Sequence, residues 1–316
     1  MSEKTRMEIP VTIGICAYNE ERNIGELLRA LLEQRTRVAE IQEILVVASG
    51  CTDKTPEIVE SLAENDGRIR LILQEERRGK ASAINEILRD ARSEVIVLES
   101  ADTMPSPEAI ELLVRPFRDS KVGVVAARPL PVDDHRTFWG GIAHALWELH
   151  HQVSLQVPKT GEMFAFRHLL EVIPDCVGAD EDWIRHSVES EGYRVVYEPL
   201  AVVHNSGPKT LDEFLKQRVR CDVQGLHQSR TGSFVTPTWR TRLIVNAFFN
   251  YARREPTKLR ALLSFSLLET MARAYSFVRV TFKSVDVPVW EELSSTKFVN
   301  LRKETEVGSM RKSTGK

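Results

Sequence analysis

Short apolar runs alternate with helical apolar repeats through the first third of the chain. The apolar runs occupy 11–17, 41–47, 70–73 and 95–98, and repeats with helical spacing begin between them at Ile24, Ile58 and Ile84. Runs of this length are typical of strands that are buried on both faces. Strands that alternate with helices build βαβ units, whose strands lie parallel in one sheet. The sequence therefore predicts an α/β fold with a mainly parallel central sheet and flanking helices.

The fourth apolar run ends in acidic and small residues, Glu99-Ser100-Ala101-Asp102. In an open α/β sheet, the carboxyl ends of the strands form the rim where ligands bind. A hard divalent cation prefers oxygen ligands, so Asp102 could hold one against a diphosphate. The alternative is a polar turn in which Ser106-Pro107-Glu108 begin the next helix.

The middle of the chain carries less regular elements. We expect strands at 122–126 and 194–197, a helix at 138–151 and a short apolar element at 161–167. An acidic triplet, Asp180-Glu181-Asp182, opens a further helix. A capping box at Thr210 and Glu213 starts the helix that carries Gln217, Arg218 and Arg220.

The composition becomes basic toward the C-terminal end. Between 207 and 283 there are 14 Lys and Arg residues and 5 Asp and Glu residues, and apolar residues recur with helical spacing. A basic amphipathic helical segment can lie on an anionic membrane surface. The alternative is a helical appendage that packs on the rest of the chain. We divide the chain into a domain at 1–232, a basic amphipathic helical extension at 233–285 and a polar, partly disordered tail at 286–316.

Composition narrows the class of protein. The 316 residues are 42% hydrophobic and 28% charged, as expected of a folded globular chain. The net charge of −2 is not that of a uniformly basic nucleic-acid binder, and we expect no nucleic-acid partner. No apolar run approaches the roughly 18 residues of a membrane span, and Met1-Ser2-Glu3-Lys4 does not begin a signal peptide. The four cysteines show no metal-binding spacing and are expected to be free thiols in a reducing compartment.

Six short motifs between residues 11 and 225 resemble, in order, those of the family 2 glycosyltransferases of the GT-A fold. Ala17-Tyr18-Asn19-Glu20 resembles the family's turn (P/A)-Y-N-E, and residues 46–55 resemble V-V-D-D-G-S-T-D-x-T. Residues 79–85 resemble G-K-x-x-A-L-N, and Ser100-Ala101-Asp102 stands at the D-x-D position. The acidic triplet and residues 192–199 resemble the E-D helix with its continuation G-Y-R-V-x-Y-x-P, and residues 217–221 resemble Q-x-x-R-W. The chain is identified as a member of this family, of prokaryotic, particularly archaeal, type.

The resemblance implies a GT-A domain at 1–232 that moves a sugar from a UDP- or GDP-sugar to a glycan or lipid-linked acceptor, with inversion and with Mg²⁺ or Mn²⁺. The implied residues of the donor nucleotide site are Ala17, Tyr18, Asn19, Glu20, Ser49, Gly79, Lys80, Ser100 and Ala101. The implied metal residues are Asp102 and His204. The implied diphosphate or acceptor residues are Gln217, Arg218, Arg220, Gly161 and Glu162. The expected location is the cytoplasm. Alternatively, the basic helices would attach the protein peripherally to the inner face of the cell membrane.

Several of these residues have ordinary structural alternatives. Lys80 could be a plain charge in the first turn of a helix, although a lysine there opposes the helix dipole. Asn19 could cap a helix, and His204 could be a satisfied loop histidine. Arg218 and Arg220 could belong to a basic helix surface.

The register of the acidic triplet leaves the general base open. By letters, Glu181-Asp182 matches E-D and Asp182 is the base. By spacing to Gly192-Tyr193, Glu181 falls at the base position and Asp180 precedes it. Adjacent acids repel one another, so we expect the pKa of one of them to be raised. We favour Asp182, with Glu181 next; the alternative is a solvated helix N-terminus, where acids are common.

Three departures from the family pattern bear on function. Ala48-Ser49 replaces an acid pair, one member of which commonly reads the nucleotide base. Ser100 replaces the first acid of D-x-D. Cys221 replaces a tryptophan that processive polysaccharide synthases place on the acceptor, which favours a non-processive enzyme. The first two departures motivate the alternative of a non-catalytic member with a decayed metal site, which binds a nucleotide sugar or a partner. A nucleotidyltransferase fits less well, because Tyr18-Asn19-Glu20 is not a glycine-rich phosphate loop.

Overall fold

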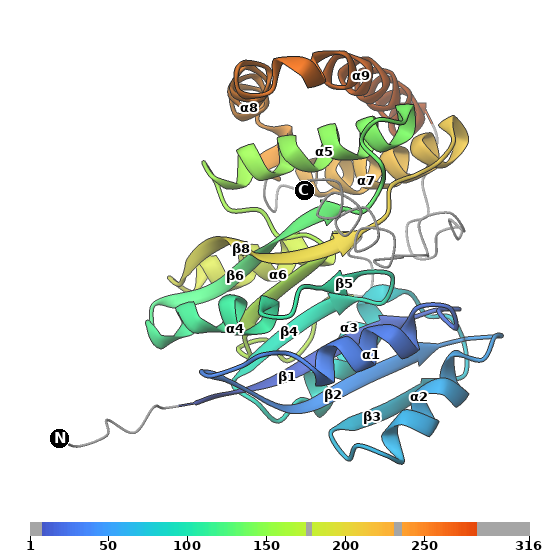
Figure 1. The fold of residues 1–316 in the computed structure, drawn as a ribbon, viewed down its shortest axis with the longest axis vertical. Helices are drawn as coiled ribbons and strands as arrows, with labels where there is room; N and C mark the ends of the chain where they lie inside the picture. Colours follow the sequence, from blue (N-terminus) through green and yellow to red (C-terminus); the bar gives the residue numbers. More distant parts are fainter. Residues whose placement is uncertain (1–7, 175–178, 231–235, 283–316) are drawn as a thin grey trace, which may run out of the picture.

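The structure is a computed structural model that describes residues 8–174, 179–230 and 236–282, without the side chains of 227–230 (Figure 1). Its centre is an eight-stranded sheet with the order β3-β2-β1-β4-β7-β6-β8-β5. The strands are β1 Ile9–Ala17, β2 Ala39–Ser49, β3 Ile69–Gln74, β4 Val95–Ser100, β5 Met104–Pro105, β6 Val122–Pro131, β7 Met163–Arg167 and β8 Arg194–Asn205.

The sheet is mostly parallel. β1 pairs in parallel with both β2 and β4, β2 with β3, and β6 with β8. β7 is antiparallel to both of its neighbours, and the two-residue β5 is antiparallel to β8. The carboxyl ends of β1, β2 and β4 therefore lie at one rim of the sheet, as the alternating pattern predicted.

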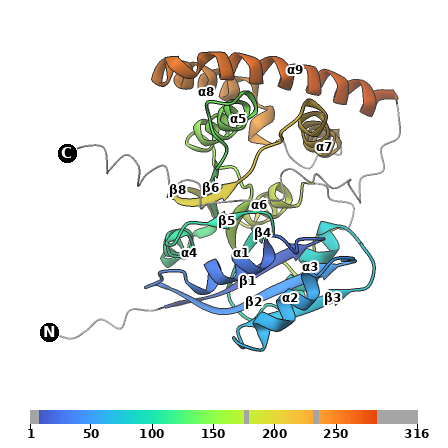
Figure 2. The ribbon, with the colours of Figure 1, turned by 45° about the vertical axis from the view of Figure 1, so that its right-hand side comes forward.

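Helices cover both faces of the sheet and form a separate layer above it (Figures 1 and 2). The sheet-covering helices are α1 Ile24–Leu32, α2 Thr55–Ala63, α3 Lys80–Asp90, α4 Ala109–Val114 and α6 Asp180–Ser190. The upper layer contains α5 Phe138–Ser154, α7 Leu211–Arg230, α8 Thr241–Arg254 and α9 Leu259–Phe282. Short 3₁₀ turns lie at Arg115–Arg118, Pro237–Trp239 and Pro256–Lys258.

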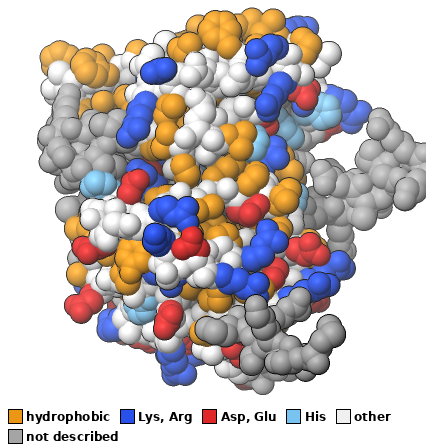
Figure 3. All heavy atoms as spheres, turned by 90° about the vertical axis from the view of Figure 1, so that its left-hand side faces the viewer, with side chains coloured by type: hydrophobic (Ala, Val, Ile, Leu, Met, Phe, Trp, Pro, Cys, Tyr) orange, Lys and Arg blue, Asp and Glu red, His pale blue; other side chains and the backbone are white. Residues whose placement is uncertain are grey.

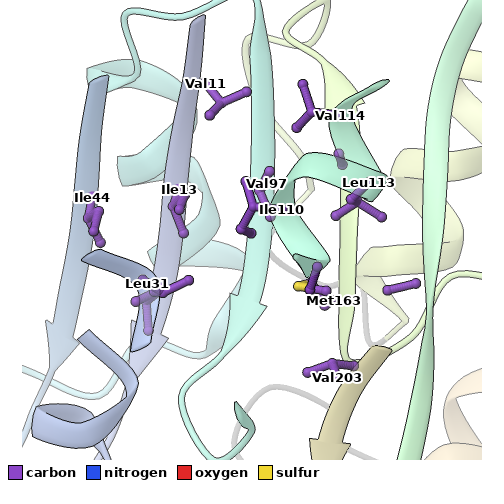
Figure 4. Close-up of a cluster of buried hydrophobic side chains, with 14 of the residues drawn as sticks. Val11, Ile13, Leu31, Ile44, Val97, Ile110, Leu113, Val114, Met163 and Val203 are labelled. Atoms are coloured by element: carbon purple, nitrogen blue, oxygen red, sulfur yellow. The ribbon is translucent and has the colours of Figure 1, made fainter. Parts of the chain in front are cut away.

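The hydrophobic core has one part on each face of the sheet and a third part in the upper layer. Figure 4 shows the first part, where Leu31 of α1 and Ile110 of α4 meet strand residues such as Ile13 and Val97. On the other face, Ile87 of α3 and neighbours from α6 cover the strands. The third part joins the four upper helices through residues that include Leu149, Phe214, Ala247 and Phe265. The upper helices therefore pack on one another and close over the rim of the sheet.

The predicted fold class is confirmed: the chain forms a mainly parallel α/β sheet with flanking helices and C-terminal helices. The element with the largest error is β8, predicted at 194–197 and observed at Arg194–Asn205. Pro199 interrupts the apolar pattern, and the register between β6 and β8 shifts at that point, with Ala126 opposite Tyr197 but Arg128 opposite Val202. Within the described residues, Cys16, Cys51 and Cys221 form no disulfide bond. Cys176 and the predicted tail at 286–316 lie outside the described residues.

Candidate active site

A cavity of about 660 Å³ opens at the carboxyl ends of β1, β2 and β4, beneath α5, α7 and α9. Most residues that the sequence singled out for chemistry line this cavity. They are Ala17, Tyr18, Glu20, Ser49, Gly79, Lys80, Ser100, Ala101, Asp102, Gly161, Glu162, Asp180, Glu181, Asp182, Gln217, Arg218 and Arg220. Two residues of the predicted site, Asn19 and His204, are not among the lining residues.

The turn after β1 presents an aromatic ring to the cavity. The guanidinium of Arg77 lies over the Tyr18 ring, 3.8 Å from its centre, and both residues line the cavity. Asn19 instead holds the neighbouring loop: its backbone is left-handed, with φ of 53°, and its Oδ1 accepts a hydrogen bond of 2.8 Å from the Thr52 N–H. Gly50 has φ of 61°, and a Cβ there would lie 2.5 Å from the backbone nitrogen of Arg77. The loop can approach Arg77 this closely because residue 50 is glycine.

Lys80 is held beside the acidic triplet. It is the first residue of α3, preceded by Gly79 with φ of 91°. Its Nζ lies 2.8 Å from Asp180 Oδ2 and 3.3 Å from Glu181 Oε1. The lysine therefore connects the start of α3 with the start of α6, across 101 positions of sequence.

Asp182 has a different set of partners. Its Oδ2 accepts hydrogen bonds from Lys159 Nζ at 3.2 Å and from Thr236 Oγ1 at 3.0 Å. Its Oδ1 is buried and has no hydrogen-bond partner among the described residues. Arg185 Nε lies 3.9 Å from Oδ1, so this oxygen is within salt-bridge distance of a buried arginine of the same helix, while Lys159 and Thr236 hold Oδ2. The sequence predicted a raised pKa for one acid of the triplet, and that acid is Asp180. Burial, together with the charge of Glu181, raises the pKa of Asp180 to about 6.

Three carboxyl groups gather where β4 ends: Glu99, Asp102 and Glu162. Burial, together with the charge of Asp102, raises the pKa of Glu162 to about 7. Burial also raises the pKa of Glu99 well above its usual range, although a hydrogen bond of 2.6 Å from Thr103 Oγ1 works against this shift. In the described part of the chain, no group of three or more His, Cys, Asp and Glu side chains is placed to hold a metal ion.

Helix α7 contributes Gln217, Arg218 and Arg220 to the cavity, and one of them has a partner that the sequence did not indicate. Arg218, which is predicted to contact the diphosphate, donates from one edge of its guanidinium, Nε and Nη2, to Glu269 of α9, with N–O distances of 2.7 and 2.8 Å. Glu269 also binds Arg273 at 2.9 Å. Gln217 has a buried Oε1 without a hydrogen-bond partner among the described residues, and Arg220 lines the cavity.

His204 lies on β8, outside the cavity lining. Its Nε2 is 3.2 Å from Ser106 Oγ, and its backbone pairs with Met104 of β5. The contact with Ser106 fits the alternative of a satisfied histidine, although His204 lies in a strand and not in a loop.

Several cavity residues were not singled out from the sequence. Arg77, Lys159, Thr236 and Glu269 contact predicted site residues from loops and from α9, far from them in sequence. None belongs to a local motif, so spacing alone gave no signal for them. The aromatic residues Trp147 and Trp239 also line the cavity.

His150 of α5 makes the stability of the fold depend on pH. It lines the cavity, is 8% exposed, and burial lowers its pKa to about 3. An unfolded chain protonates histidine near pH ~6.5, so below that value the unfolded state takes up a proton that the folded state does not. Proton uptake by His150 in the unfolded state therefore leaves the free energy of unfolding unchanged well above pH ~6.5 and lowers it progressively as the pH falls below that value.

Replacing His150 with Gln is expected to reduce this acid sensitivity. Between pH 6.5 and 5, the free energy of unfolding of the variant should rise relative to that of the wild type by about 2 kcal/mol, because one pKa unit is worth about 1.4 kcal/mol. Urea unfolding at the two pH values measures the difference. Wild-type and variant stabilities that change in parallel with pH would contradict the assignment.

The fold is that of a GT-A domain, with a cavity at the rim of its sheet. The model of the family described as glycosyl transferase family 2 matches residues 12–179, more than half of the chain. The chain therefore belongs to glycosyl transferase family 2.

Curated relatives and a solved structure agree with this assignment. The poly-beta-1,6-N-acetyl-D-glucosamine synthase of Staphylococcus aureus is 29% identical over 232 residues, which are 69% of this chain and 55% of that protein. Glycosyltransferase AglD of Haloferax volcanii is 31% identical over 119 residues, 37% of this chain and 19% of that protein. The chain thus spans about half the length of the first of these relatives. A mannosyltransferase from Pyrobaculum calidifontis, solved with GDP-Man and Mn²⁺, shares the fold with a TM-score of 0.56 and 24% identity, over 96% of this chain and 81% of that one.

Proposed function

We propose that the protein transfers a single sugar from a UDP- or GDP-sugar to an acceptor, with inversion at the sugar and with help from Mg²⁺ or Mn²⁺. The observation that carries the proposal is the convergence of Asp102, Lys80 and the acidic triplet on one cavity at the rim of a family 2 sheet. A donor binds there with its diphosphate toward Asp102 and its sugar toward α6. The absence of tryptophan at position 221 favours transfer of one sugar at a time.

Tyr18 and Arg77 suit the nucleoside part of the donor. The Tyr18 ring with the Arg77 guanidinium over it forms a flat, partly cationic surface at the end of β1. A planar base can stack on such a surface. Because Ala48-Ser49 stands where the family carries an acid pair, stacking has a larger share in base recognition than hydrogen bonding to a carboxylate.

The residues at the end of β4 fit a divalent cation. Their donor atoms are carboxylate oxygens, which are the ligands that Mg²⁺ and Mn²⁺ prefer, and oxygens of the donor diphosphate would complete the coordination. When bound, the cation would supply positive charge that stabilises the departing diphosphate. Asp102 would hold it. Lys80, whose Nζ is within 3.3 Å of two carboxylates, adds a fixed positive charge on the same side of the cavity.

Asp182 is the general base in this proposal. An inverting displacement needs one base that takes the proton of the acceptor hydroxyl as the new bond forms. Lys159 and Thr236 hold Oδ2 of Asp182, and Oδ1, which accepts no hydrogen bond from a described residue, is the oxygen that would take the proton. Asp180 and Glu181 share Lys80 instead, so their negative charges are partly committed to that ion pair.

A panel of UDP- and GDP-sugars tests the proposed function. The released nucleoside diphosphate is measured with and without Mn²⁺, and the anomeric configuration of the product is read by NMR. We expect one donor to be consumed in the presence of Mn²⁺ with inversion. Saturable donor binding without consumption of any donor, with a range of acceptors, would favour the alternative of a non-catalytic sugar-nucleotide-binding protein.

The outer face of α9 supports an acceptor held at a membrane. Exposed apolar side chains recur every three or four residues along it and form one stripe: Leu263, Leu267, Met271, Tyr275, Val278 and Phe282, between 52% and 80% exposed. The opposite face packs on α5 and α7 through Leu262, Phe265 and Ala272. A helix that is apolar all round is normally covered on every side, by protein or by lipid.

Basic residues accompany the apolar stripe. Residues 236–282 contain eight Lys and Arg residues and two acids, of which Glu269 is buried. Arg242, Arg253 and Arg260 are exposed on α8 and at the start of α9. Figure 3 shows hydrophobic side chains gathered at the top of the molecule, where these helices lie. Such a surface suits the interface of an anionic membrane, and a lipid-linked acceptor presented there would lie close to the cavity beneath α9. In the described part of the chain, no helix has both the length and the apolar character needed to cross a bilayer.

The double variant with Leu267→Gln and Met271→Gln is expected to bind anionic vesicles at least about tenfold more weakly, because burying each apolar side chain contributes roughly 1.5–3 kcal/mol. Sedimentation with vesicles containing phosphatidylglycerol measures the binding. Leu169→Gln, which changes an exposed leucine after β7, is the matched control and should bind as the wild type does. Unchanged binding of the double variant, or no binding by the wild type, would contradict the membrane proposal.

A further inference from the structure

The serine at the D-x-D position leaves the end of β4 one carboxylate short, and the sheet places another acid directly beside it. β7 runs antiparallel to β4, with Met163 opposite Glu99. One step further along, the Ser100 N–H donates a hydrogen bond of 3.1 Å to the backbone oxygen of Glu162. Glu162 is thus the cross-strand neighbour of Ser100, and its side chain lines the same cavity as Asp102.

We propose that Glu162 supplies the carboxylate that Ser100 lacks, so that Glu162 and Asp102 together hold the divalent cation against the donor diphosphate. The ligand set is then assembled from two neighbouring strands rather than from one strand end. This inference rests on the proposed function and identifies the second protein ligand of its metal site.

Two unpartnered buried oxygens beside Glu162 point to a cation. Asn205 is 5% exposed, its Nδ2 lies 3.5 Å from Glu162 Oε1, and its Oδ1 has no hydrogen-bond partner among the described residues. Glu99 is 4% exposed, and its Oε2 likewise has none, while its Oε1 accepts from Thr103. Both residues line the cavity. Buried oxygens without hydrogen bonds are costly unless another group satisfies them, and a hard cation is such a group.

The negative charges around Glu162 also favour a bound cation. Glu162 and Asp102 repel one another in a partly buried site, and Glu99 adds a third acid nearby. A divalent cation between the carboxylates would offset this repulsion. The described side chains do not complete a metal site by themselves, which is consistent with a cation that binds together with the diphosphate.

Mn²⁺ binding in the presence of UDP or GDP tests the inference without an activity assay. Electron paramagnetic resonance of free Mn²⁺ gives the affinity for wild type, Glu162→Gln and the double variant Ser100→Asp with Glu162→Gln. We expect Glu162→Gln to weaken Mn²⁺ binding by roughly tenfold or more. The double variant should recover most of this loss, since Ser100→Asp restores an acid at the strand end. Glu148→Gln, which changes a carboxylate outside the cavity, should bind as the wild type does.

The outcomes separate this inference from the proposed function. If the folded Glu162→Gln variant binds Mn²⁺ as tightly as the wild type while Asp102→Asn does not, the role of Glu162 is wrong and the proposed function stands. Failure of the double variant to recover binding, with its thermal unfolding unchanged, also overturns the role. If the wild type binds no Mn²⁺ with either nucleotide, both the inference and the metal-dependent function are wrong.

Discussion

Replacing Asp102 with Asn is expected to slow sugar transfer by about 10³-fold. In the proposed function this carboxylate holds the cation that neutralises the leaving diphosphate. Metal and electrostatic stabilisation of a leaving group contribute several kcal/mol to catalysis, and about 4 kcal/mol corresponds to three powers of ten in rate. The initial rate of nucleoside diphosphate release at saturating Mn²⁺ measures the effect.

The substitution keeps the size of the side chain, so its effect can be separated from misfolding. Asp102 is half-buried, and Asn at this position preserves most contacts of the Asp side chain. Thermal unfolding without ligand should therefore change little. A turnover within about fivefold of the wild type would show that Asp102 does not carry the metal.

Asp182→Asn is expected to reduce turnover by 10²- to 10⁴-fold while leaving the affinity for the donor nearly unchanged. Proton transfer by a positioned base typically contributes this much, and an amide cannot accept the proton. Lys159 and Thr236 can still donate to the amide oxygen, so the local geometry should persist. Single-turnover rates together with calorimetric donor binding distinguish a lost base from a lost binding site.

Asp180→Asn and Glu181→Gln are the matched comparisons for this prediction. Both acids bind Lys80, so their removal should alter donor affinity more than the chemical step. If Asp180→Asn instead abolishes turnover and Asp182→Asn does not, Asp180 is the base. In that case the rate should fall as the pH drops below about 6, where Asp180 becomes protonated.

The fold and the positions of the chemical groups could be read from the sequence because each depends on local pattern. Apolar runs located the strands, and the rule that ligands bind at strand carboxyl ends placed Asp102 at the cavity. Glycine at position 79 marked the start of α3 and the place of Lys80, where φ of 91° favours glycine. These features need only a few neighbouring residues, so a single sequence suffices to find them.

The contacts that decide what each group can do depend on distant segments. Arg218 is predicted to contact the diphosphate because arginine on that helix suits an anion, whereas its contact with Glu269, 51 positions later, through Nε and Nη2 had no signal in the sequence. Thr236, which fixes Asp182, is 54 positions away. No periodicity links such pairs, because they meet only when segments that are distant in sequence pack together above the sheet.

Glu269 also connects the cavity with the surface of α9. Its carboxylate faces Arg218 in the cavity, whereas Leu267 and Met271, two positions away on either side, lie on the exposed apolar stripe. The apolar stripe proposed to bind lipid and the side chain that holds a cavity arginine therefore belong to the same two turns of one helix. The proposed membrane-binding surface and the proposed active site thus share residues of one helix, α9, rather than of a loop.

The most direct test of the central claim is calorimetric binding of UDP and GDP to the wild-type protein with and without Mn²⁺. The cavity at the ends of β1 and β4 predicts that one of the two nucleotides binds, and that Mn²⁺ tightens its Kd by at least about fivefold through shared contacts with the diphosphate. Loss of this coupling in Asp102→Asn would locate the effect at the end of β4. Failure of both nucleotides to bind, with Mn²⁺ present and the protein folded, would contradict a nucleotide-sugar site in this cavity.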